Sequence, residues 1–294
     1  MIIAHTIPEL LLLRKAIDAI VGFVPTMGGI HAGHLGLIQE ARKDNETVLA
    51  SVFLNPKQFT EAKDFQQYQR DLTRDCQLLR EAGVDLAFVP EIAEMYPENF
   101  QTYVEVEQLS KCWEGAARPG HFRAVATVVT ILLNIAQPDR AYFGQKDIQQ
   151  VAVIRQMVRD LRIPTEIIVV PTYRAKDGLA LSTRNHLLST EERKRANAIY
   201  GALRAVMAAY ENEVRDVDDL RHILRETLAQ GKITRIDYAD IVDVQTLKPL
   251  QGALTDEAVA LVLVAAHLGQ TRLIDNCLIP AHKNNRAELT RLFG

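Results

Sequence analysis

Two histidines lie in a glycine-rich segment that directly follows an apolar run. Residues 25–34 read PTMGGIHAGH and come after the apolar stretch 20–24. A buried strand, then such a turn, then a helix over 35–41 would direct backbone N–H groups and the positive end of the helix dipole at one place. His31 and His34 are three residues apart and would share one face of the first helical turn. The pattern favours a site for the phosphates of a nucleotide, although either histidine alone could be a capping or surface residue.

Four further segments place polar groups at expected turns and helix starts. Gln58 in NPKQF can bind a hydroxyl or carboxylate through its amide, and Arg118 opens a loop, RPGHFR, that could hold an anion. Lys146 in FGQKD precedes an expected helix, and the loop 181–185 reads LSTRN. Each segment alone could be an ordinary turn, surface loop or linker. Together they supply groups for nucleotidyl transfer, in which catalysis consists of positioning and charge neutralisation.

Several common sites are absent from the sequence. It contains neither GxxxxGKS/T nor GxGxxG, which are the signatures of the commonest phosphate loops. It suggests no Ser-His-Asp or Cys-His arrangement and no cluster of metal ligands, so we predict no protein-bound metal.

Length and composition indicate a soluble globular protein of about two domains or one large domain. The chain has 294 residues, 48% hydrophobic and 24% charged, with a net charge of −3 and no basic run. This argues against nucleic acid or an anionic membrane as the main partner. We expect no signal peptide, since charges interrupt the N-terminal apolar stretch, and the uncharged run 124–137 predicts a buried helix. Three widely spaced cysteines without a CxxC motif predict reduced thiols and a cytoplasmic location.

Alternating patterns predict an α/β fold over residues 1–185, with a doubly wound, mainly parallel sheet. Its ligands would bind beyond the carboxyl ends of the strands. For residues 186–280 we predict a smaller α+β domain that begins with one long helix from Thr190, and for 281–294 a helical or frayed tail. The expected strands are 20–24, 47–54, 84–89, 165–170, 236–244 and 258–266, and the further helices are 70–82, 125–136, 148–161 and 217–230.

These segments together resemble the pantothenate synthetase (pantoate–β-alanine ligase) family of the HxGH nucleotidyltransferases. The motifs that carry the resemblance are PTMGGIHAGH, NPKQF, RPGHFRAV, YFGQKDIQQ and KDGLALSTRN. The resemblance implies that ATP and (R)-pantoate form pantoyl adenylate and pyrophosphate, after which β-alanine gives pantothenate and AMP. It also implies Mg²⁺ with the ATP, a Rossmann-like ATP- and pantoate-binding catalytic domain, a C-terminal lid domain and a homodimer.

The resemblance also assigns residue roles. It implies that His34, as proton donor, and His31 and Lys146 are catalytic, and that Gln58, Gln150 and Arg118 bind substrate. Lys57, Gln69 and Tyr173 depart from the family's usual residues. Two alternatives stay open, another HxGH-type nucleotidyltransferase and a catalytically silent nucleotide-binding protein. The implied ATP-binding residues are Met27, Gly28, Gly29, Ile30, His31, Ala32, Gly33, His34, Gly144, Gln145, Lys146, Asp147, Tyr173, Leu181, Ser182, Thr183 and Arg184.

Overall fold

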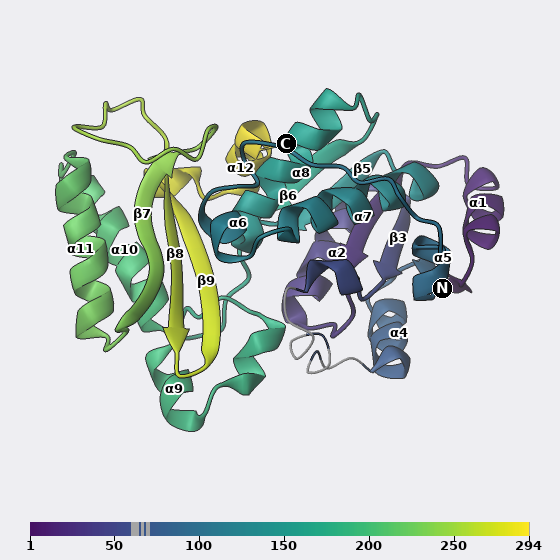
Figure 1. The fold of residues 1–294 in the computed structure, drawn as a ribbon, viewed down its shortest axis with the longest axis horizontal. Helices are drawn as coiled ribbons and strands as arrows, with labels where there is room; N and C mark the ends of the chain where they lie inside the picture. The colour runs from purple at the N-terminus through teal and green to yellow at the C-terminus, as the bar shows by residue number, and fades with distance from the viewer. Residues whose placement is uncertain (60–64, 66–67, 69–70, 294) are drawn as a thin grey trace. The chain divides into compact units, whose positions relative to one another are not determined.

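The chain divides into two compact units (Figure 1). The computed structural model describes residues 1–59, 65, 68 and 71–293, so Gln69 lies outside the described residues. The first unit comprises Met1–Gly144, Gln149–Val170 and the chain end from Phe293, and the second comprises Gln145–Ile148 and Pro171–Leu292. Each unit has a hydrophobic core of its own.

The first unit is built on a six-stranded sheet in which all neighbouring strands are parallel. The chain builds outward from β2 through β3 to β4 and then returns to place β5 on the other side of β2. Ligands of open α/β sheets bind where the strand order reverses in this way. The predicted doubly wound parallel sheet is confirmed. The spatial order is β1 (Ile2–Ala4), β4 (Leu86–Phe88), β3 (Thr47–Val52), β2 (Val21–Thr26), β5 (Arg140–Gly144) and β6 (Glu166–Val170).

Local signals explain where the helices of the first unit begin and end. α4 starts after Asp71, whose carboxylate accepts from the N–H of Arg74, and it ends before Gly83, whose φ of 87° favours glycine. α7 is buried along much of its length, as the apolar run 124–137 predicts. None of the described helices is long and apolar enough to span a membrane. The α-helices among the described residues of this unit are α1 (Ile7–Lys15), α2 (Ala32–Asp44), α4 (Leu72–Glu81), α5 (Ile92–Met95), α6 (Trp113–Ala117), α7 (His121–Ala136) and, except for its first residue, α8 (Ile148–Asp160).

The second unit packs helices against an antiparallel three-stranded sheet ordered β7-β8-β9. Its core joins Val206 and Leu224 of two helices to Val262 and Leu273 of the sheet. The predicted α+β class of this smaller domain is confirmed. Its elements are α9 (Thr190–Arg195), α10 (Ala198–Glu211), α11 (Val217–Gln230), β7 (Arg235–Asp243), β8 (Ala260–Leu268), β9 (Thr271–Ile279) and, except for its last residue, α12 (Arg286–Phe293).

One expectation for this region needs correction. The single helix predicted from Thr190 is two helices, because α9 ends at Arg195 and α10 begins at Ala198. Residues 281–294, expected to be a helical or frayed tail, contain the helix α12, in which Leu289 is buried.

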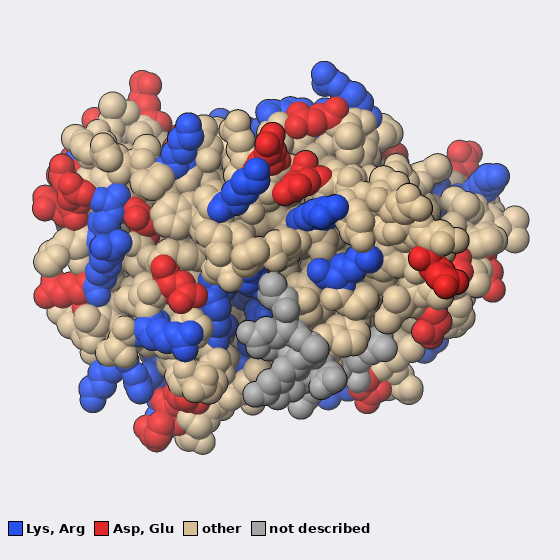
Figure 2. Space-filling model, in the orientation of Figure 1, with Lys and Arg blue, Asp and Glu red and all other residues tan. Residues whose placement is uncertain are grey.

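The domain boundary was predicted at residue 185, whereas the main segment of the second unit begins at Pro171. Residues 171–185 group with the second unit, since Leu179 belongs to its core and Arg174 pairs with Asp275. The catalytic and lid roles of the two domains stay predictions. On the face shown in Figure 2, acidic and basic side chains are interspersed, in keeping with the net charge of −3.

Candidate active site

A buried carboxylate holds the glycine turn that follows β2. Gly28 and Gly29 have φ values of 84° and 65°, a left-handed conformation that costs least for glycine. Asp75 of α4 is 2% exposed and accepts hydrogen bonds from the N–H groups of Gly29 (2.9 Å) and Ile30 (2.8 Å). The N–H of Gly28 donates to Thr26 Oγ1 (3.2 Å). These three N–H groups donate to the protein's own oxygens, so they are not directed at the phosphates of a bound ligand as expected.

His31 and His34 form a capping box at the start of α2. His31 Nδ1 accepts from the N–H of Gly33 (3.0 Å), and His34 Nδ1 accepts from the N–H of His31 (3.4 Å). The two ring centroids are 4.1 Å apart. Because each Nδ1 is an acceptor, we assign the proton of a neutral ring to Nε2. Each ring therefore carries an Nε2–H donor at a helix N-terminus, where negative charge is stabilised.

Gln58 is tied to the loop that carries Arg118. It ends the short 3₁₀ helix η1 (Pro56–Gln58) and is 8% exposed. Its Oε1 accepts from Asn55 Nδ2 (3.0 Å), which leaves Nε2 as the donor end of the amide. Its main-chain carbonyl accepts from Arg118 Nη2 (3.1 Å) and lies 3.0 Å from His121 Nδ1. Two of the predicted substrate-binding residues, Gln58 and Arg118, are therefore neighbours.

Lys57 lies among aromatic rings. Its Nζ is 5.0 Å from the ring centroid of Tyr96, 5.6 Å from that of Phe100 and 5.2 Å from that of Tyr103. Nζ also donates to Tyr103 Oη (3.0 Å), and this hydrogen bond lowers the pKa of Tyr103. Lys57 departs from the family's usual residue, and the positive charge of its ammonium group is stabilised by three aromatic rings and by a phenol oxygen.

Gln149 holds the segment 109–114 from its place on α8. Its Oε1 accepts from the N–H of Glu114 (2.9 Å). Its Nε2 donates to the carbonyls of Leu109 (2.9 Å) and Cys112 (2.8 Å). The next residue, Gln150, is half-buried, and its contact with pantoate stays a prediction.

In the second unit, three predicted ATP-binding residues line one pocket. Lys146, Ser182 and Arg184 line it together with Arg272 and Asp275. Three cations and a hydroxyl face one carboxylate, that of Asp275, which is already paired with Arg174, so the lining suits an anionic ligand. The grouping of these side chains is present in the structure, and their contact with ATP stays a prediction. The other lining residues are Leu179, Ala180, Ile199, Leu273 and Ile274.

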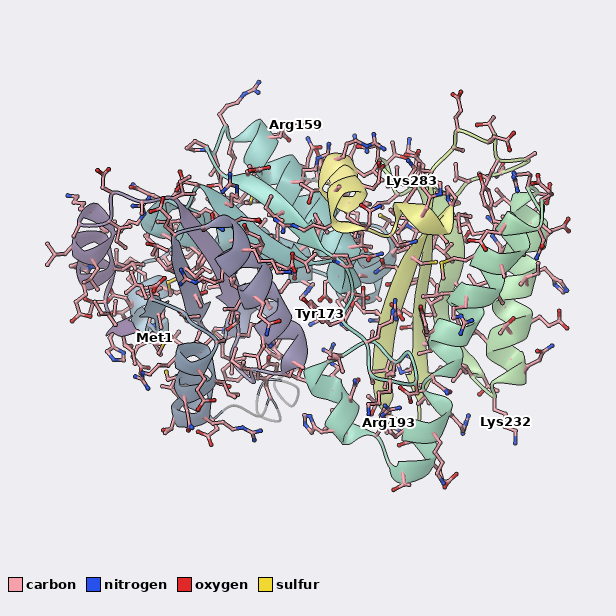
Figure 3. All side chains as sticks on the ribbon, turned by 180° about the vertical axis from the view of Figure 1, so that it is seen from behind. Met1, Arg159, Tyr173, Arg193, Lys232 and Lys283 are labelled. Atoms are coloured by element: carbon pink, nitrogen blue, oxygen red, sulfur yellow. The ribbon has the colours of Figure 1, made fainter. Side chains whose placement is uncertain are left out.

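The loop 181–185 continues from a short hairpin. The N–H of Leu181 donates to the carbonyl of Tyr173 (2.9 Å), which is labelled in Figure 3. Ser182 Oγ then accepts from the N–H of Arg184 (3.2 Å) and caps the 3₁₀ helix η3 (Thr183–Leu187). The predicted hydroxyl and guanidinium groups therefore come from one capped turn.

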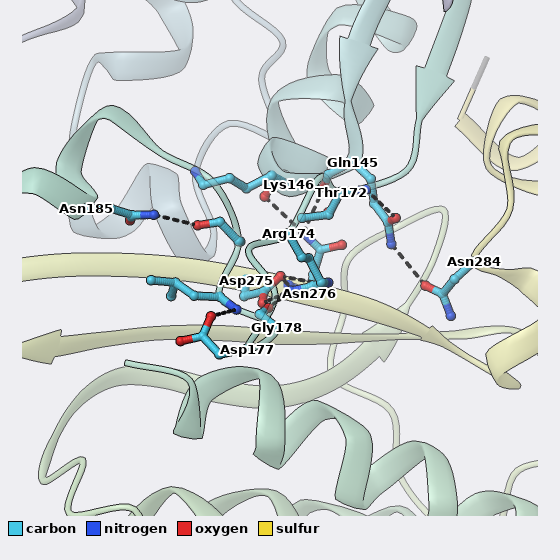
Figure 4. A network of polar contacts seen from close by, with 12 residues as sticks. Gln145, Lys146, Thr172, Arg174, Asp177, Gly178, Asn185, Asp275, Asn276 and Asn284 are labelled. Carbon is cyan, nitrogen blue, oxygen red and sulfur yellow. Dashed lines mark hydrogen bonds and ion pairs between the residues drawn. The ribbon is translucent and has the colours of Figure 1, made fainter. Parts of the chain in front are cut away.

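A network of polar contacts joins this hairpin to β9 (Figure 4). Asp275, whose side chain is 3% exposed, accepts from Arg174 Nη1 (2.5 Å) and Nη2 (3.0 Å). The guanidinium lies 3.9 Å from the ring centroid of Tyr200. On the same strand, Asn276 Nδ2 donates to the main-chain carbonyl oxygens of Gln145 (2.9 Å) and Lys146 (3.0 Å).

The remaining predicted residues follow strand ends or lie in the same turns. Gly144 ends β5, and Gln145 Nε2 donates to Asn284 Oδ1 (3.0 Å). Asp147 Oδ1 is 3.5 Å from Lys146 Nζ. Met27 is half-buried after β2, and Ala32 and Gly33 form the first turn of α2. His31 and His34 belong to the first unit, and Lys146, Ser182 and Arg184 to the second.

Sequence reasoning missed three polar residues that support these groups, namely Asp75, Gln149 and Asn276. Asp75 lies four residues before Leu79 and so shares the buried face of its helix, where a charge requires partners. Asn276 follows Asp275 in β9 between the apolar pair Leu273 and Ile274 and the apolar end of the strand from Cys277. A buried polar residue at an apolar position was the available signal in both cases.

A family model described as Pantoate-beta-alanine ligase matches residues 3–278. The chain belongs to this family. The pantothenate synthetase of Herpetosiphon aurantiacus is 48% identical over 277 residues, which cover 94% of this chain and 99% of that protein. The pantothenate synthetase of Fervidobacterium nodosum is 47% identical over 88% of this chain and 91% of that protein.

Solved structures agree with the sequence comparison. The pantothenate synthetase from Thermus thermophilus has a TM-score of 0.88 at 49% identity, covering 94% of this chain and 98% of that one. A pantoate-beta-alanine ligase from Francisella tularensis, complexed with Beta-gamma ATP and Beta-alanine, has a TM-score of 0.76 at 35% identity and covers 95% and 97%. The chain is therefore an enzyme of pantothenate synthesis, which these findings support over the two alternatives.

Proposed function

We propose that the chain joins (R)-pantoate to β-alanine in two steps through a pantoyl adenylate. In the first step a carboxylate oxygen of pantoate attacks the α-phosphorus of ATP, and the bond from that phosphorus to pyrophosphate breaks. In the second step the amine nitrogen of β-alanine attacks the acyl carbon, and the bond from that carbon to the AMP oxygen breaks. The amine proton passes to solvent.

The pocket lined by Lys146, Ser182 and Arg184 is the observation that carries this proposal. We assign the phosphates of ATP to it, with Lys146 stabilising the charge that builds on the leaving pyrophosphate. Ser182 and Arg184 would hold the terminal phosphates. Donors placed in advance of the reaction lower its barrier without reorganising during the step.

In the first unit, His31 and His34 would donate from Nε2 to phosphate oxygens. The capping box supports this role because it holds each Nδ1 as an acceptor. Gln58 would bind pantoate and then β-alanine through its amide, with Gln150 and Arg118 as further substrate contacts.

Mg²⁺ would enter with ATP as part of the substrate. Mg²⁺ in phosphate-transferring sites binds substrate phosphates and one or two carboxylates. Asp147, next to Lys146 and with a side chain that is 48% exposed, fits the carboxylate role. We also propose a homodimer in the cytoplasm, which light scattering and cell fractionation would test.

The test is to follow pyrophosphate and AMP release from MgATP and (R)-pantoate, with and without β-alanine. If AMP is released over repeated turnovers only when β-alanine is present, the result supports both steps. ATP binding without pyrophosphate release contradicts the proposal. Lys146→Ala should slow pyrophosphate release about 10²–10³-fold. Lys194→Ala, at a surface lysine whose side chain is 67% exposed, is the matched control and should leave it unchanged.

A further inference from the structure

Asn276 binds the backbone of the turn that carries Lys146. Asn276 is 1% exposed in β9, and its Nδ2 donates to the carbonyl oxygens of Gln145 and Lys146, at 2.9 Å and 3.0 Å (Figure 4). These contacts join residues that are 131 and 130 positions apart in the sequence. One buried amide therefore holds two consecutive carbonyls of a three-residue 3₁₀ turn, η2 (Gln145–Asp147).

The turn is too short to set the position of Lys146 by itself. A 3₁₀ turn of this length has few internal hydrogen bonds, so its geometry depends on outside contacts. Gln145 supplies a second anchor, because its Nε2 donates to Asn284 (3.0 Å) and its Oε1 accepts from the N–H of Thr172 (3.4 Å). Those contacts fix the residue before Lys146, whereas Asn276 binds the carbonyl of Lys146 itself.

The neighbouring residue connects the same strand to the other side of the pocket. Side chains of consecutive strand residues point to opposite faces. Asp275 binds Arg174 in the hairpin that leads to Ser182 and Arg184, whereas Asn276 binds the Lys146 turn. Two consecutive residues of β9 thus hydrogen-bond to both segments that line the pocket, the Lys146 turn and the hairpin before Ser182.

We propose that Asn276 is a positioning residue for Lys146 in adenylate formation, an inference that rests on the role proposed for Lys146 above. Without its two N–H donors the turn can shift, and Lys146 Nζ then leaves the position in which it stabilises the leaving pyrophosphate. A displacement of about 1 Å can cost about 10²-fold in rate. Binding of pantoate, which Lys146 does not contact in our proposal, should be unaffected.

The experiment compares Asn276→Ala and Asn276→Ser with the wild-type enzyme, using the rate of pyrophosphate release from MgATP and (R)-pantoate. We expect kcat to fall about 10- to 100-fold for the alanine variant and less for serine, which keeps one donor. The KM for (R)-pantoate should stay within about twofold. Asn212→Ala removes an exposed asparagine whose Nδ2 donates to a carbonyl of the helix that it follows, and should match the wild type. If the alanine variant does not fold by circular dichroism, the serine variant carries the test.

The double variant with Lys146→Ala separates positioning from general damage. If Asn276 acts through Lys146, Asn276→Ala should cause no further loss in the Lys146→Ala background. If the fold-losses in kcat of the two single variants multiply in the double variant, the inference is overturned. It is also overturned if Asn276→Ala raises the KM for (R)-pantoate by the same factor by which it lowers kcat. If Lys146→Ala is slow while folded Asn276→Ala is normal, this inference fails alone. If Lys146→Ala itself turns over normally, the role proposed for Lys146 fails and the inference fails with it.

Discussion

Replacement of Asp75 should damage the glycine turn more than any other single change in α4. The carboxylate is 2% exposed and accepts from two consecutive main-chain N–H groups, those of Gly29 and Ile30. Asp75→Asn keeps the shape of the side chain but turns one acceptor oxygen into an NH₂ donor. One of the two N–H groups then faces another donor in a buried place.

The expected loss follows from these two bonds. A hydrogen bond to a charged group contributes about 1.5–3 kcal/mol, and a buried N–H without an acceptor costs about 1–3 kcal/mol. Asp75→Asn should therefore lower the free energy of unfolding by about 2–4 kcal/mol. Asp75→Ala, which leaves both N–H groups without this acceptor, should lower it by about 3–6 kcal/mol. Against a typical total of about 5–15 kcal/mol this is a large fraction.

Urea unfolding followed by circular dichroism measures this loss. The matched control is Asp71→Ala, which removes the exposed cap of the same helix and should cost about 1 kcal/mol. Since the turn carries His31, Asp75→Asn should also slow pyrophosphate release in protein that is still folded. If Asp75→Asn unfolds at the same urea concentration as Asp71→Ala and its turnover is unchanged, the reasoning is refuted.

Three further predictions follow from the described contacts. His34→Ala should slow pyrophosphate release about 10²–10³-fold in folded protein, since a donor at the α2 terminus is lost, and near-normal turnover would contradict this. Lys57→Met should raise the pKa of Tyr103 toward its ordinary value, because the hydrogen bond that lowers it disappears. Tyrosinate absorbance against pH, with Tyr103→Phe to assign the signal, measures that change, and an unmoved titration would argue against the contact. Arg174→Ala should lower the free energy of unfolding by about 3–5 kcal/mol, because it leaves the buried carboxylate of Asp275 without its ion partner. Thermal unfolding checks this, and Asp275→Asn in the same chain should recover part of the loss.

Elements with strong local signals were predicted well. The run 47–54 predicted β3 because a strand buried on both faces of a parallel sheet reads as a continuous apolar stretch. α11 was predicted with the bounds that it has, since Leu220, Leu224 and Leu228 recur at helical spacing behind the capping Asp216. β9 was not predicted, because Asp275 and Asn276 interrupt its apolar pattern.

Supporting residues were harder to predict because their partners are distant in the sequence. The carboxylate of Asp75 meets an N–H group 46 residues away, and Gln149 meets the N–H of Glu114 35 residues away. Side-chain periodicity indicates which face of an element is buried. It does not indicate which distant carbonyl or N–H group lies opposite that face.

The sequence by itself determined the reactive residue types and the order of the elements that carry them. Gly28 and Gly29 allow the turn after β2, and the spacing of His31 and His34 brings their rings together at the start of α2. Tertiary structure decided which groups hold those residues in place. Asp75 at the turn and Asn276 at Lys146 act through hydrogen bonds to main-chain atoms, and any residue type offers such atoms. Only the packing of sheet and helices selects the main-chain atoms that these buried side chains meet.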